Sequence, residues 1–148
     1  MVIPHLFTKI RLPASLPQGM ERIVLGLKRS KSKKECLRKA YDILTKKYRG
    51  YRGKTYYRAH ELFVTDTSTL WKRSGFLHCT HMNYLMRILL VKSGWFADEE
   101  ILPQFTFVMF FSPHQYLRIQ LSEQENVAVD LWGKAYNVPF GDYARGFR

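Results

Sequence analysis

The strongest helical pattern in the chain lies in the segment CTHMNYLMRILLVK, residues 79–92. Its apolar positions recur every three or four residues, the spacing of one helix face, at Met82, Leu85, Met86 and Leu89. Gly94 follows, and glycine is common just beyond the end of a helix. Cys79 comes three residues before Met82, so the spacing predicts a helix over about 79–92 with the Cys79 thiol on the packed side of its first turn.

A second helical pattern covers residues 34–48, with apolar positions at 37, 40, 41, 44 and 48. Cys36 lies beside this face, where we expect a buried and inert thiol. The first 20 residues contain the breakers Pro13, Pro17 and Gly19, which favour an irregular or partly extended arm. The polar sequence KRSKSKK then links this arm to the helix, and a loop is predicted over residues 65–74.

The second half of the chain has the patterns of strands. FTFVMFF, residues 105–111, is an aromatic and β-branched run typical of a strand that is buried on both faces. Residues 114–121 alternate, which places His114 on the polar face and the leucines and isoleucine on the other. A polar turn, SEQEN, separates this strand from VAVDLWG at residues 127–133. Helices followed by an antiparallel sheet favour an α+β fold.

Length and composition set the class of protein. A chain of 148 residues with 46% hydrophobic content predicts one globular domain over residues 1–148. No apolar run approaches the ~20 residues of a membrane span, and the N-terminus lacks the pattern of a signal peptide. The chain has two cysteines, and their spacing does not suggest a secreted scaffold held by disulfides. This favours a reducing compartment, so we expect a cytoplasmic protein.

The net charge of +12 is concentrated in the first part of the chain. Residues 1–60 hold 16 Lys or Arg against three acidic residues, whereas residues 61–148 hold eight against nine. Tyrosines at 48, 51, 56 and 57 interleave with the basic residues of 22–58, a mixture that suits nucleic acid or another polyanion. A solvated basic face without a specific ligand is the alternative.

Cys79 is placed where a thiol gains reactivity, because the backbone N–H groups and dipole at a helix start favour a thiolate. A thiolate nucleophile also needs an imidazole, and the imidazole needs an acceptor that sets its tautomer. His114 and Asp130, on the two predicted strands, are the candidates. The structural alternatives are a packed thiol, a strand histidine and a carboxylate that caps a turn.

The order of these residues resembles the transglutaminase-like superfamily. Cys79 opens an apolar helix, His114 heads PHQYLRI, Asp130 ends NVAVD, and the tail VPFGDYARGF follows. The resemblance spans roughly residues 35–147, preceded by residues 1–34 as a basic arm. It implies a papain-like core in which the nucleophile helix packs against an antiparallel sheet.

The resemblance also implies roles for single residues. Cys79 is the nucleophile, His114 the general base and acid, and Asp130 the residue that orients His114. Trp71 is the nearest upstream candidate for a side chain of the oxyanion hole, beside the Cys79 backbone N–H. The sequence departs from the family in two places: His78 stands where a small or polar residue is usual, and no tryptophan or glutamine for the oxyanion hole lies at a recognisable offset.

The expected activity is therefore that of a cysteine hydrolase or acyltransferase on a protein, peptide or other amide, with hydrolysis favoured and no cofactor. A non-catalytic module that binds a polyanion through residues 22–58 is the alternative. A metal site formed by His78, Cys79 and His81 is disfavoured, because the neighbours His78 and Cys79 diverge on a helix and a zinc site needs a fourth ligand or a water in the right geometry.

The strand register poses a difficulty for the triad. A simple turn centred on Gln124 places Arg118, and not His114, opposite Asp130. The two candidate residues are then four positions out of register, roughly 13 Å apart at the rise of a strand. A bulge, a strong twist or a shorter turn near Ser122 is needed to bring them together.

Overall fold

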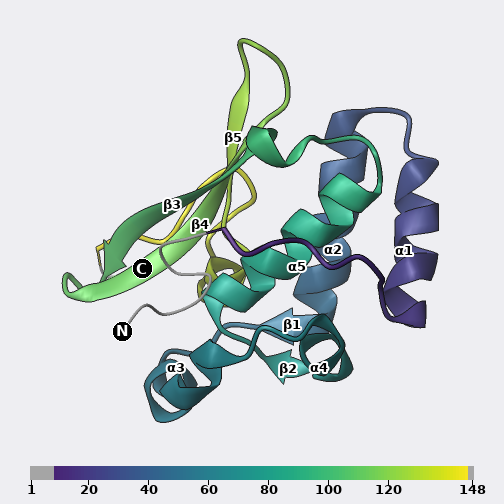
Figure 1. The fold of residues 1–148 in the computed structure, drawn as a ribbon. Helices are drawn as coiled ribbons and strands as arrows, with labels where there is room; N and C mark the ends of the chain where they lie inside the picture. The colour runs from purple at the N-terminus through teal and green to yellow at the C-terminus, as the bar shows by residue number, and fades with distance from the viewer. Residues whose placement is uncertain (1–8, 147–148) are drawn as a thin grey trace.

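Helix α5, Cys79–Lys92, is the central element of the fold, and every residue from Thr80 to Leu90 is buried. The computed structural model, which describes residues 9–146, is a mixed α+β structure of helices and two small sheets (Figure 1). Helix α5 packs against strand β4 on one side and against helices α1 and α2 on the other. A helix that is surrounded in this way needs apolar residues around its whole circumference.

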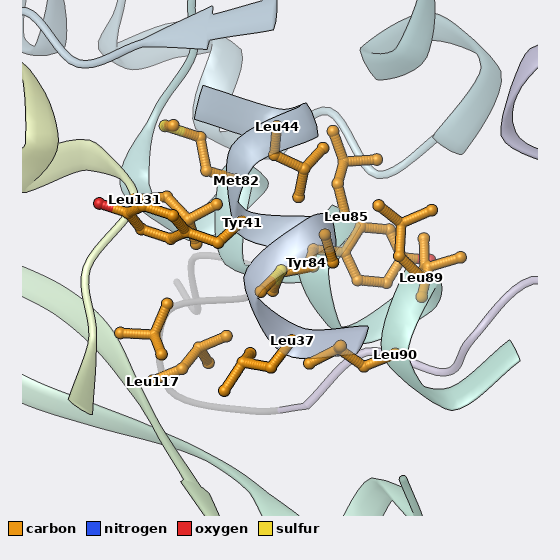
Figure 2. Packing of buried hydrophobic residues seen from close by; sticks show 14 of the residues in the cluster. Leu37, Tyr41, Leu44, Met82, Tyr84, Leu85, Leu89, Leu90, Leu117 and Leu131 are labelled. Atoms are coloured by element: carbon orange, nitrogen blue, oxygen red, sulfur yellow. The ribbon is translucent and has the colours of Figure 1, made fainter. Parts of the chain in front are cut away.

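Helix α2, Lys33–Lys47, presents the predicted apolar face to α5. Ser32 caps its N-terminus by accepting a hydrogen bond from the Glu35 N–H at 3.1 Å. Figure 2 shows side chains of both helices meeting along this seam, among them Leu37, Tyr41, Leu44, Leu85 and Leu89. Cys36 is buried as predicted, and its sulfur lies 3.5 Å from the Ser93 hydroxyl.

Part of the predicted N-terminal arm is a helix. Residues Gln18–Lys28 form α1, which packs on α5 and α2 with Met20, Val24 and Leu27 buried. Pro17 stands at its N-cap position, where a proline does not interrupt helical hydrogen bonds. The apolar spacing 20, 24, 27 is that of a helix face, so treating residues 1–34 as an arm was wrong for this segment.

The larger sheet is antiparallel, in the order β3-β4-β5. Its strands are Ile101–Val108, Ser112–Gln120 and Asn126–Val129, so β4 is central. The prediction of a strand at 105–111 buried on both faces was wrong, because β3 is an edge strand that starts earlier and carries the exposed Phe105 and Phe107. The apolar run continues past the strand end into a tight turn at residues 109–111.

The register of β4 and β5 resolves the difficulty with the simple turn. Ile119 lies opposite Val127 and Leu117 opposite Val129, a shift of two residues from the expected pairing. Arg118 faces Ala128, and Asp130 lies beyond the end of β5. A shift of two residues keeps every side chain on its own face, so the hydrophobic pattern is satisfied by both registers.

The remaining elements frame the start of α5. Strand β1, Tyr48–Arg49, pairs in parallel with β2, Gly75–Phe76, and this pairing leads directly into α5. Two short helices lie between them: α3, Arg52–Tyr57, and α4, Thr67–Lys72, the latter within the predicted loop. Among the helices of residues 9–146, none has both the length and the apolar character of a membrane span.

Candidate active site

His114 and Asp130 form a buried pair at the end of the sheet. The His114 Nε2 atom lies 2.7 Å from Asp130 Oδ2, and the two side chains are 3% and 1% exposed. Asp130 comes just after β5, so the chain has left the ladder and the carboxylate can reach diagonally toward β4. The structure therefore brings together two of the residues that the sequence singled out.

Backbone N–H groups hold the Asp130 carboxylate in place. Oδ1 accepts a hydrogen bond from the Gly133 N–H at 2.8 Å, and Oδ2 accepts one from the Ala144 N–H at 2.8 Å. A Cβ atom at position 133 would lie 2.7 Å from Oδ2, so only glycine permits this close approach. The C-terminal tail and the turn after β5 thus both serve to position one carboxylate.

The environment of His114 favours its protonated form. Burial by itself would lower the pKa of the imidazole, because a charged ring loses hydration. The charge and hydrogen bond of Asp130 act in the opposite direction, and the Cys79 side chain adds to them through a hydrogen bond and an electrostatic interaction. Together they raise the pKa of His114 to about 10.

Cys79 is the first residue of α5 and is partly exposed. The backbone N–H groups of a first helical turn lack intrahelical partners, and they favour a negative charge at this position. Because His114 Nε2 is bonded to Asp130, Nδ1 is the ring nitrogen that remains for the thiol. Asn83 on α5 donates to the Gln115 carbonyl at 3.1 Å, which ties the helix of Cys79 to the strand of His114.

A cavity of about 120 Å³ opens onto the thiol and the imidazole. Helix α3 contributes Arg52, Thr55 and Tyr56 to its wall, and the β3–β4 turn contributes residues on the other side. The Trp132 ring lies 5.0 Å from the His114 ring and also lines the cavity. A reacting group held in this cavity would have both Cys79 and His114 among its polar neighbours.

The sequence did not point to Trp132, Gly133 or Gly50 as part of the site. A Cβ at position 50 would lie 2.6 Å from the Trp132 ring, so Gly50 lets that tryptophan lie close to the chain and over His114. The sequence signal was present in the pair Trp-Gly two residues beyond Asp130. Its meaning depends on the turn after β5, which no local pattern identifies.

Trp71, the sequence candidate for the oxyanion hole, lies away from the thiol cavity. It lies on α4 against Tyr48 and Lys47, and it does not line the cavity that holds Cys79. A Cβ at Gly19 would lie 2.9 Å from its indole nitrogen, so that N–H lies against α1. Among the cavity residues, the Cys79 backbone N–H remains the candidate donor.

The two histidines beside Cys79 are both buried. His78 is buried, its Nε2 lies 2.9 Å from the Arg58 carbonyl oxygen, and burial lowers its pKa. His81 is fully buried, packs edge-on against His78, and is not among the described residues that line the thiol cavity. Over residues 9–146, no three His, Cys, Asp or Glu side chains are grouped as a metal site requires.

Comparisons of the chain with protein-family models, with curated proteins and with solved structures find no match. The site is therefore defined by its geometry: a thiol at a helix start, an imidazole beside it, and a buried carboxylate on that imidazole.

The raised pKa of His114 predicts how stability depends on pH. The folded-state pKa of about 10 exceeds the ordinary value of 6.5, so the ion pair stabilises fully below about pH 6.5 and is lost as pH rises toward 10. Urea unfolding should show this decline. Asp130→Asn should flatten it, and NMR titration should place the His114 midpoint lower in the variant. A wild-type midpoint near 6.5 would contradict the pairing.

Gly133→Ala tests the close approach to Asp130. The new methyl group must displace the carboxylate, so alkylation of Cys79 by iodoacetamide near neutral pH should slow by about a hundredfold. Gly26→Ala is the matched control, because nothing lies within 4 Å of that position in α1, and it should leave the rate unchanged. Equal rates in the two variants would argue against a positioning role for Gly133.

Proposed function

We propose that the protein is a cysteine hydrolase or acyltransferase that acts on amides through Cys79, His114 and Asp130. The buried His114–Asp130 contact of 2.7 Å, beside a thiol at a helix start, is the observation that carries the proposal. A buried carboxylate is costly unless it is paired. A structural ion pair has no need of a cavity, whereas this one adjoins a cavity that contains the thiol.

The acylation step follows from these positions. The Cys79 thiolate attacks the carbonyl carbon of the amide, and the Cys79 backbone N–H stabilises the oxyanion that forms. Protonated His114 gives its proton to the amide nitrogen as the carbon–nitrogen bond breaks. The products of this step are a thioester on Cys79 and a free amine.

Deacylation returns the enzyme to its starting state. Neutral His114 takes a proton from water, and the hydroxide adds to the thioester carbon. The carbon–sulfur bond then breaks, which releases a carboxylic acid and restores the thiolate and the imidazolium. An amine in place of water gives acyl transfer by the same route. Asp130 holds the ring in place by accepting its hydrogen bond and stabilises the charged ring.

The fold that we propose for this chemistry is the papain-like core of the transglutaminase-like superfamily. Two features support it: the thiol opens a buried helix, α5, and that helix packs against the strand that carries the histidine. The order Cys79, His114, Asp130 along the chain and the tail that binds Asp130 agree with the resemblance.

Binding of a polyanion is a second candidate function, and a cleft away from the thiol favours it. This cleft has a volume of about 670 Å³ and is lined by Lys46, Lys47, Arg49 and Lys134, and no Asp or Glu is among the described residues that line it. Tyr56 and Tyr57 are exposed and available for stacking. Tyr48 is not, because it is buried with its hydroxyl bonded to the Leu70 carbonyl.

Asp130→Asn tests the proposed triad. An amide nitrogen can donate where His114 needs an acceptor, so acyl-enzyme formation should fall by about three to four orders of magnitude while Cys79 remains in place. Arg118→Met is the control, because Arg118 faces Ala128 and does not contact the pair. Intact mass after incubation with a thioester or anilide substrate measures acylation, and melting temperature tests the fold. Intact acylation in Asp130→Asn would remove Asp130 from the triad.

Single-stranded RNA tests the basic cleft. Log affinity should fall linearly with log salt concentration, by about 0.7 for each phosphate neutralised. Lys46→Ala with Lys134→Ala should reduce that slope, whereas Lys72→Ala with Lys92→Ala removes the same charge elsewhere and should leave it unchanged. Binding that is absent at low salt, or equally weakened by both pairs, would leave the charge as a solvated face.

A further inference from the structure

The wall of the thiol cavity is mainly apolar. Its volume of about 120 Å³ is slightly smaller than that of an engineered apolar cavity, about 150 Å³, that binds benzene. It therefore has room for one aliphatic or aromatic side chain. Arg52 is the charged residue in the wall apart from the site itself, and no carboxylate side chain lines it among the described residues. The apolar part of the wall consists of Tyr56, Val108, Met109, Phe111, Pro113 and Trp132.

Three of the apolar wall residues are also exposed at the surface. The β3–β4 turn exposes Met109 and Phe111, with Phe111 exposed by 73%. On the other side of the cavity, Tyr56 of α3 is exposed by 57%. Exposed apolar residues gathered at one place are typical of a binding surface, because they gain stability only when something covers them.

The backbone of the turn is held in an unfavourable conformation. Met109 and Phe110 have φ values of 53° and 64°, in the left-handed region that large side chains rarely adopt. Residues in such conformations cluster at ligand-binding sites. Here the turn places Met109 and Phe111 in the cavity wall, close to Cys79.

We propose that the cavity binds an apolar side chain of a peptide substrate, carried by the first or second residue on the acyl side of the cleaved bond. This inference rests on the proposed function, since Cys79 and His114 lie in the same wall. An apolar side chain gains by leaving water, whereas a charged one would lose its hydration in a mainly apolar wall whose guanidinium, that of Arg52, already lies over the Tyr136 ring. The bound side chain would also hold the adjacent carbonyl at the thiol.

Peptidyl chloromethyl ketones test this preference on the intact protein. The thiolate displaces chloride and forms a carbon–sulfur bond, so intact mass and peptide mapping report alkylation of Cys79 without any turnover. One series carries Leu, Met or Phe at the first or second position, and the other carries Gly, Asp or Lys. At one of these positions the apolar series should react at least about tenfold faster.

Two variants locate the preference in the cavity. Met109→Asn suits the left-handed backbone but makes the wall polar, so it should remove most of the apolar preference. Phe110→Asn is the matched control, because it changes the next residue in the same conformation, outside the wall as the described residues form it, and it should keep the preference. Thr55→Phe should shift the preference from Phe toward smaller side chains by filling the cavity.

The possible results separate the two proposals. Rapid alkylation of Cys79 that depends on His114, but with equal rates for apolar and charged reagents, would overturn the apolar preference and leave the thiol enzyme standing. Alkylation of Cys79 no faster than of Cys36, and unchanged in His114→Ala, would overturn both. Loss of the preference in Phe110→Asn as well as in Met109→Asn would also overturn the assignment to the cavity wall.

Discussion

The structure around the site depends on the burial of one carboxylate. Asp130 is almost completely inaccessible to water, and a charge in that position is stable only if donors surround it. Those donors are the His114 ring and the N–H groups of Gly133 and Ala144, from three separate parts of the chain. The end of β5, the turn that follows it and the path of the C-terminal tail are all constrained by this requirement.

The same requirement explains which parts of the site the sequence could predict. The position of Cys79 followed from the spacing of apolar residues in α5, a local pattern that survives folding. The alternation of polar and apolar residues along β4 predicted which face of the strand carries His114. The meeting of His114 and Asp130 did not follow, because registers that differ by two residues bury the same faces. In the register that the structure adopts, Asp130 lies just beyond the last residue of β5 that pairs with β4.

The sequence analysis missed elements in which two sequence patterns predict different structures. Helix α1 begins after Pro17 and includes Gly19, and these two breakers obscured the apolar spacing of Met20, Val24 and Leu27. The aromatic run at 105–111 indicated a buried strand, because composition alone cannot distinguish buried aromatic residues from exposed ones. Trp71 and Trp132 could be told apart only by tertiary contacts, since both are tryptophans beside short helical segments.

A stack of rings links the basic half of the chain to the site. The Arg52 guanidinium lies 4.3 Å from the Tyr136 ring centre, Tyr136 stacks on Trp132 at 5.0 Å, and Trp132 lies 5.0 Å from His114. Guanidinium and aromatic rings attract one another most strongly when water is excluded. Because Arg52 also lines the thiol cavity, the cationic segment that begins α3 is part of the structure that covers His114. The charge of the first half and the chemistry of the second half therefore meet at this cavity, and a substrate bound there would contact both.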